Sequence, residues 1–389
     1  MEKWKRYKLC DLVQRNICYG IVQPGECIPN GVPIVKVNNI ISRTVNINSL
    51  ERTSQEISSR YSRTILNGGE LLISVVGSPG KCMIAPSNFK GANIVRAVAM
   101  IDIEDKNLSE WVYYYLTSNE AQQYLEIRLN TTVQATLNIK ELAELPIPVP
   151  SFDVRYKIVS VLKSIDTKIE LNRRINDNLE QQAQALFAEI FESDYTFAQL
   201  GAVIETCSGG TPSRNNLDYY IDGTICWVKS KELNRSFLFD TEEKIAQVGI
   251  DKSSAKLLPK NSVLIAMYGA TVGEYCIIDK PMTCNQAICA LLPSSDYPAS
   301  YLYMFVKQKR NELINLAVGS AQQNISQVLI KGLSVSANLK LIAKFDKMVM
   351  PIFNMIRKNA KESIILEAER NTLLPRLMSG ELKINDLNS

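Results

Sequence analysis

The chain of 389 residues contains no histidine. Histidine is the most common general base and the most common metal ligand, so its absence excludes Ser-His-Asp and Cys-His catalytic arrangements. The nine cysteines are scattered and form no C-x-x-C pair, which argues against a zinc site or a disulfide framework and favours a reducing, cytoplasmic environment. Any catalysis would therefore have to rest on carboxylates, lysine or tyrosine.

The signals of membrane proteins and of nucleotide-binding enzymes are also missing. There is no run of about 18 apolar residues and no charged-then-apolar start, so neither a membrane span nor a secretory signal is expected. Segment 77–82 has a Gly-Lys pair, but it lacks the first glycine and the hydroxyl of a G-x-x-x-x-G-K-[ST] phosphate loop. The carboxylates form no tight cluster along the sequence. We therefore expect this chain to bind no metal or cofactor of its own.

What the chain does contain is an internal repeat, in which the second half follows the first at a shift of roughly 190 residues. Four pairs of landmarks carry the repeat, in the same order in both halves. The pairs are 66–74 with 258–266, 76–81 with 268–274, Asn93 with Asn285, and 134–138 with 322–326. Two similar modules on one chain indicate two similar functions.

Each module is followed by a long segment with helical spacing. Residues from about 153 to 192 contain no proline or glycine, and their apolar residues, with Asn172 and Asn176, recur at steps of four and three. The segment after the second module has a similar seam that includes Asn359 and Ser363. A buried asparagine requires a polar partner and so selects one register, which predicts that the polar positions of the two seams meet.

Helices of about 35 to 40 residues would be roughly 50 to 60 Å long, so an antiparallel pair within the chain would be a rigid spacer between the modules. Two alternatives are that each helix packs on its own module or pairs with another copy of the chain. Pro351 is expected to kink the second helix or to restart it. The expected domains are 1–150 and 195–336 for the modules, and 151–194 and 337–389 for the helices.

The charge distribution favours nucleic-acid binding through local patches, because the net charge of +4 is only mildly basic. Lys36 and Lys229 each follow a predicted strand, at matching places in the two modules. For any single basic residue, a solvated surface charge is an adequate explanation. The recurrence at matching places is what supports a binding function.

Glycine turns and amides provide further candidates. The turns have a plain explanation in positive φ angles, but glycine also lets a backbone approach a phosphate, and amides pair with adenine edges. The basic residue Arg214 and the amide of Gln286 are further polar candidates. The candidate DNA contacts are Lys36, Asn38, Gly77, Ser78, Lys81, Asn93, Gln134, Gly210, Thr211, Ser213, Lys229, Lys231, Tyr268, Thr271, Asn285, Gln322, Gln323 and Asn324.

Several segments together resemble the DNA-specificity subunit of type I restriction-modification systems, and the resemblance covers essentially the whole chain. The helical signatures are the more specific part. The segments are Gly-Gly-Thr-Pro-Ser at 209–213, Gly-Ala-Thr-Val-Gly at 269–273, Asn-Gln-Ala at 285–287, Lys-Ile-Glu-Leu-Asn-Arg-Arg-Ile-Asn at 168–176, and the tail at 370–382.

The resemblance implies an α+β fold with two mixed α/β target-recognition domains, joined by two long helices that pair as an antiparallel coiled coil. Each domain would read one half of a split site in double-stranded DNA, and the helices would act as the ruler. It also implies a non-catalytic chain that docks two methyltransferase subunits and two motor/nuclease subunits. S-adenosylmethionine, ATP and Mg would then be bound by those partners.

Two other classes of protein remain open. A coiled-coil protein-interaction scaffold without DNA specificity would show the same repeat and the same seams, but no salt-sensitive binding to duplex DNA. A carboxylate-based hydrolase would show activity from the chain alone, and this activity would be lost on changing a few Asp or Glu residues.

Overall fold

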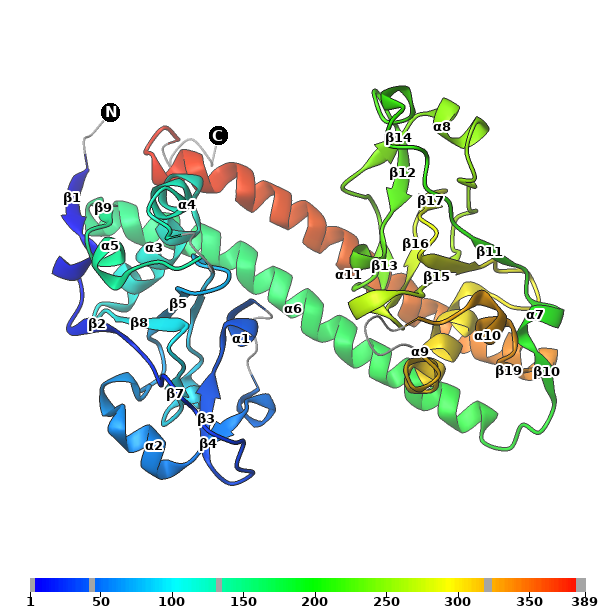
Figure 1. The fold of residues 1–389 in the computed structure, drawn as a ribbon, viewed down its shortest axis with the longest axis horizontal. Helices are drawn as coiled ribbons and strands as arrows, with labels where there is room; N and C mark the ends of the chain where they lie inside the picture. The colour runs from blue at the N-terminus through cyan, green and yellow to red at the C-terminus, as the bar shows by residue number, and fades with distance from the viewer. Residues whose placement is uncertain (1–3, 42–45, 131–134, 318–323, 383–389) are drawn as a thin grey trace. The chain divides into compact units, whose positions relative to one another are not determined.

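The computed structural model divides into two compact units, each of which contains one sequence repeat and part of both long helices (Figure 1). The first unit is 1–167 with 366–389, and the second is 168–365. The residues that the structure describes are 4–41, 46–130, 135–317 and 324–382.

The first unit is a mixed α and β module. Its elements are β1 (Lys5–Lys8), β2 (Arg15–Tyr19), β3 (Val32–Val35), α1 (Val37–Ile41), β4 (Arg52–Thr53), α2 (Gln55–Arg60), β5 (Leu71–Ser74), β6 (Cys82–Ile84), β7 (Asn93–Ile94), β8 (Val98–Asp102), α3 (Lys106–Thr117), α4 (Asn119–Glu126), α5 (Ile139–Ala143) and β9 (Pro146–Val149). An antiparallel sheet has the order β2-β8-β5-β6. In a smaller sheet, β3 pairs antiparallel with β4 and parallel with β7, while β1 pairs with β9.

The second unit repeats this topology. Its elements are β10 (Phe197–Gln199), α7 (Leu200–Val203), β11 (Thr206–Ser208), β12 (Ile225–Val228), β13 (Phe237–Leu238), β14 (Lys244–Ile245), α8 (Gln247–Asp251), β15 (Val263–Ala266), β16 (Tyr275–Ile278), β17 (Thr283–Cys284), β18 (Ile288–Leu291), α9 (Ala299–Asn315), α10 (Gln327–Lys331) and β19 (Ser334–Ser336). The sheets have the orders β11-β18-β15-β16-β13, β14-β12-β17 and β10-β19. Apart from the added β13, each strand has a counterpart in the first unit.

The central strand of each larger sheet is buried along its whole length, which explains its continuous apolar sequence. One helix of each unit covers this sheet: α3 packs against β6, and α9 packs against β15 and β16. Trp111 of α3 is fully buried, and its indole N–H donates to the Pro148 carbonyl oxygen at 2.8 Å. The buried cores therefore hold the sheets in position, and the loops at the strand ends are the segments that present polar side chains.

Backbone pairing confirms much of the sequence repeat. Val76 forms an isolated bridge with Thr136, and Tyr268 forms the same bridge with Asn324. Immediately after these bridges, Asn138 caps α5 and Ser326 caps α10, each with its side chain. The predicted match between 134–138 and 322–326 therefore holds for the described residues of these segments.

The predicted match between Asn93 and Asn285 is wrong by two residues. In the parallel pairs, Ile34 lies opposite Asn93, whereas Trp227 lies opposite Thr283. Asn285 N–H donates to the Val228 carbonyl oxygen, as Val95 N–H does to Val35 in the first unit. The sequence match was misleading because the difference in residue number between equivalent positions of the two modules changes along the chain. It is not the same for β7 and β17 as for β5 and β15.

Both predicted helices are present as α6 (Phe152–Phe191) and α11 (Leu339–Met378), each 40 residues long. They pair antiparallel: Asn172 lies close to Asn359 in the second unit, and Asp166 accepts a hydrogen bond from Arg370 at 2.6 Å in the first. The predicted intramolecular pairing is confirmed. Packing of a helix on its own module also occurs, since Phe187 belongs to the core of the second unit.

The predicted meeting of the polar seam positions is confirmed. The Asn172 amide N–H group donates to Ser363 Oγ at 3.4 Å and to Glu362 at 2.8 Å. Asn359 donates to Asn176 Oδ1 at 2.9 Å. The helices therefore share a polar layer in which Asn172 and Asn359 are buried, and this layer fixes their register.

Helix α11 runs through Pro351, so a restart of the helix at this residue is a prediction that the structure overturns. Proline removes one helical N–H donor, which leaves the carbonyl oxygen of Lys347 without its usual partner. Pro351 lies on an exposed face of the helix, where water can bind that oxygen.

Candidate nucleic-acid interface

Lys36 and Lys229 occupy the same position in the two modules. Each lysine directly follows the middle strand of the smaller sheet, β3 or β12. Val35 and Val228, the residues before the two lysines, are fully buried, whereas both lysine side chains are partly exposed. The predicted correspondence of the two lysines is therefore confirmed by backbone position.

Each lysine forms an ion pair with a glutamate on the neighbouring strand segment. Lys36 Nζ lies 2.5 Å from Glu51 Oε2, and Lys229 pairs with Glu243. The two glutamates are also equivalent, because the Glu51 carbonyl oxygen accepts from Ile34 N–H and that of Glu243 accepts from Trp227 N–H. The sequence analysis missed both glutamates.

In the second module, Glu243 holds two cations. Arg214 Nη2 lies 2.6 Å from Glu243 Oε2, while Lys229 pairs with the other carboxylate oxygen. The hydrogen bond from Lys229, assisted by that from Arg214, holds the pKa of Glu243 below its usual range. The carboxylate therefore remains charged at neutral pH.

Aromatic rings support the Arg214 guanidinium. Its carbon lies 4.5 Å from the ring centre of Tyr220 and 5.1 Å from that of Trp227. Such cation–π contacts orient the guanidinium, while 53% of the side chain stays exposed. An exposed, oriented guanidinium is well suited to a phosphate or to a guanine edge.

The Gly-Gly-Thr-Pro-Ser loop lies against the same sheet. A Cβ atom on Gly209 would lie 2.1 Å from the Asn285 carbonyl oxygen, so only glycine fits. Gly210 is buried, and both its backbone polar groups are used, by Cys284 and by the Trp227 indole. Gly210 is therefore explained by close packing, and the structure does not support it as a DNA contact.

The exposed polar residues of this loop remain candidates. Thr211 hydrogen-bonds Gln286, whose side chain is exposed, and Ser213 is also exposed. The side chain of Asn285 accepts a hydrogen bond from Ala287 N–H at 3.2 Å and is only partly exposed. Lys231, at the end of the same sheet, is exposed and pairs with Glu242. Direct contacts join part of this set, because Thr211 hydrogen-bonds Gln286, and Arg214 and Lys229 share Glu243.

The equivalent segment of the first module contains an arginine that the sequence analysis missed. Val75 and Met267 each directly follow a central strand, and their N–H groups donate to the carbonyl oxygens of Ala97 and Ala287. Ala97 and Ala287 therefore occupy equivalent positions. Arg96 therefore corresponds to Gln286, and its side chain is exposed. Aligning the two modules at this position, rather than on Asn93, would have identified it.

Asn93 is buried, and the prediction that it contacts DNA is not supported. Its amide oxygen accepts from Thr64 Oγ1 at 2.7 Å and its amide nitrogen donates to Ser58 Oγ at 3.1 Å. Its exposed fraction is 0%. Asn93 therefore holds residues 58–64, at and after the end of α2, whereas Asn38 is exposed and remains a candidate.

Glycine hairpins connect the central strands to the next strand in both modules. In the first, Gly77 has a φ of 81° and its N–H donates to the Ala135 carbonyl oxygen, so its role is the turn itself. Ser78 and Lys81, on either side of the hairpin, are exposed. In the second hairpin, Thr271 Oγ1 donates to the Tyr268 carbonyl oxygen at 3.2 Å, and both residues are partly exposed.

Part of the candidate set lies outside the described residues. Gln134, Gln322 and Gln323 belong to 131–134 and 318–323, which the structure does not describe. Asn324, which follows the second of these segments, is exposed. These amides stay predictions.

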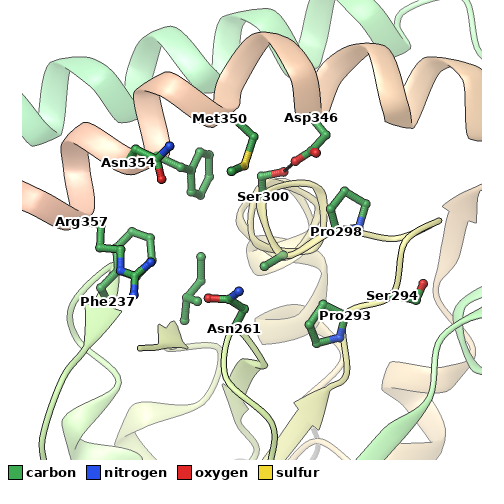
Figure 2. A pocket seen from close by; sticks show the side chains of 13 residues that line it. Phe237, Asn261, Pro293, Ser294, Pro298, Ser300, Asp346, Met350, Asn354 and Arg357 are labelled. Carbon is green, nitrogen blue, oxygen red and sulfur yellow. Dashed lines mark hydrogen bonds between the residues drawn. The ribbon is translucent and has the colours of Figure 1, made fainter. Parts of the chain in front are cut away.

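The second unit also contains a cavity of about 400 Å³ (Figure 2). It is lined by residues of α9, α11, β13 and β16, and none of the candidate DNA contacts lines it. Its two charged residues already have partners, since Asp346 accepts from the Ser300 hydroxyl and Arg357 pairs with Asp279. We therefore do not include the cavity in the interface.

Across 4–41, 46–130, 135–317 and 324–382, no three His, Cys, Asp or Glu side chains gather where they could hold a metal ion. None of the described helices combines the length and the hydrophobicity needed to cross a bilayer.

The sequence of this chain matches a family model and known proteins. The family described as "Type I restriction modification DNA specificity domain" matches residues 1–181 and 192–336. The HindI specificity subunit of Haemophilus influenzae is 24% identical, over 98% of this chain and 100% of that protein. The EcoBI specificity subunit of Escherichia coli is 29% identical, over 50% of this chain and 42% of that protein.

A solved structure shows the same fold. The S subunit of a type I restriction-modification system from M. genitalium superposes with a TM-score of 0.54 at 17% identity, over 96% of each chain. The α+β fold of two repeated modules and two paired long helices is thus common to both. The family match covers both modules and most of α6, and so this chain belongs to the DNA-specificity subunits of type I restriction-modification systems.

Proposed function

We propose that this non-catalytic specificity subunit recognises a bipartite site in double-stranded DNA, each module reading one half. The observation that carries the proposal is the recurrence of the same polar arrangement at equivalent backbone positions. Lys36 with Arg96 in one module corresponds to Lys229 with Gln286 in the other. Two similar surfaces with different side chains are suited to reading two different short sequences.

The paired helices supply a spacing function in this proposal. Helices of 40 residues are about 60 Å long at 1.5 Å per residue, and the Asn172 and Asn359 layer allows one register. A fixed register would give a fixed number of unread bases between the half-sites.

The proposal extends to partner subunits. We propose that two methyltransferase subunits and two motor/nuclease subunits bind this chain and carry S-adenosylmethionine, ATP and Mg. Exposed apolar residues on α11 support protein docking, because a partner that covers them would remove apolar surface from water. They include Met348, Met350, Met355 and Ile365.

A salt titration tests the DNA-binding part of this proposal. The full chain is titrated with a labelled duplex by fluorescence anisotropy at several KCl concentrations. Lysine and arginine contacts to phosphate release counterions, so the logarithm of the association constant is expected to decrease linearly with the logarithm of salt concentration. Binding that does not change with salt, or no binding to duplex, would favour a protein-interaction scaffold.

A further inference from the structure

Each module contains an equivalent lysine–glutamate ion pair, Lys36–Glu51 in the first and Lys229–Glu243 in the second. Attraction between the lysines and DNA does not by itself explain the glutamates. A surface that binds phosphate is weakened by a carboxylate beside its cations. Nevertheless, both modules have the carboxylate at the same backbone position. Neighbouring positions differ, since Ile34 in one module corresponds to Trp227 in the other. The recurrence of the pair within differing surroundings indicates a function.

Glu243 offsets the positive charge of the two cations with which it pairs. Both carboxylate oxygens are used, one by Lys229 and one by Arg214. Arg214 is held independently by the rings of Tyr220 and Trp227, so its orientation does not depend on Glu243 alone. Because Arg214 is 53% exposed and Glu243 33%, a phosphate can still reach the cations by competing with the carboxylate.

We infer that Glu51 and Glu243 are charge-balancing residues that limit the binding of this chain to DNA of nonmatching sequence. The inference rests on the proposed function. At a nonmatching duplex only phosphate contacts are available, and these must displace a carboxylate from Lys36 or Lys229. At the matching site, base contacts add free energy that phosphates do not supply. Weak nonspecific binding matters because nonmatching sites in a genome greatly outnumber matching ones.

The test uses the full chain with a duplex of about 30 base pairs and shuffled sequence, across a range of KCl concentrations. Glu243→Gln removes the charge and preserves the side-chain shape. One additional phosphate contact should steepen the salt slope by about 0.9 and tighten nonspecific binding about 5-fold at about 0.15 M salt. Adding Glu51→Gln should raise the effect to about 25-fold, because the two sites belong to separate modules and their effects multiply.

Glu189→Gln is the matched control, because Glu189 lies exposed on α6 and its substitution changes the net charge equally. It should bind like the wild type. A melting curve by circular dichroism checks that the variants fold, and Glu51→Gln alone repeats the test in the other module.

The outcomes separate the two proposals. The inference would be overturned if Glu243→Gln bound the duplex only as tightly as the Glu189→Gln control, or more weakly. The proposed function would still stand in that case, provided that duplex binding by the wild type depends on salt. Weaker binding would instead assign Glu243 a direct DNA contact. A wild-type chain without salt-dependent duplex binding would overturn both.

Discussion

At the scale of single residues, similar sequence contexts conceal different environments. Asn93 and Asn285 were paired by sequence, yet Asn93 is fully buried and Asn285 lies two positions further along the fold. Lys36 and Lys229 were paired correctly because each follows an apolar strand that the sequence marks clearly. Their glutamate partners lie 15 and 14 positions away, on other strand segments, so no local spacing reveals them.

Burial of Asn93 gives a prediction about stability. Asn93→Ala removes the buried hydrogen bonds of the Asn93 side chain with Thr64 Oγ1 and Ser58 Oγ, so the free energy of unfolding should decrease by about 2 to 4 kcal/mol. Urea denaturation followed by circular dichroism measures the change, with exposed Asn38→Ala as the control. An unchanged unfolding midpoint together with lost DNA binding would return Asn93 to the list of contacts.

At the scale of elements, the long helices were the most predictable part of the chain. Their heptad seam is continuous, and α6 begins and ends within one residue of the predicted range of about 153 to 192. The behaviour of Pro351 was not predictable, because the cost of proline in a helix depends on whether water reaches the carbonyl oxygen that it leaves free. The short strands β4 and β7, with two residues each, carry too little pattern to identify from sequence.

The polar layer between the helices gives a second prediction. Asn176→Leu or Asn359→Leu alone leaves the other amide facing an apolar side chain, which should cost about 1 to 3 kcal/mol. The double variant should recover part of this loss, with a coupling energy of about 0.5 to 3 kcal/mol, because neither amide is then left unpaired. Thermal and urea denaturation of the four proteins give the cycle. Strict additivity of the two single changes would show that the side chains do not interact.

At the scale of the whole molecule, the duplication connects sequence, fold and function. The repeated landmarks predicted two modules with one topology, and the strand orders bear this out apart from the added β13. The family was predicted from motifs in the loops and helices, and the match to both modules confirms it. The DNA sequence that is read was not predictable, because side chains such as Arg96 and Gln286 specify bases only in a defined docked position.

We propose that this chain gives a methyltransferase its sequence specificity. The most direct test is a base-resolution map of DNA methylation in cells that contain this chain with a cognate methyltransferase subunit, compared with cells that contain the methyltransferase alone. We expect a split motif with a fixed gap that appears only when this chain is present. No new methylation, although both proteins are soluble and associated, would contradict it.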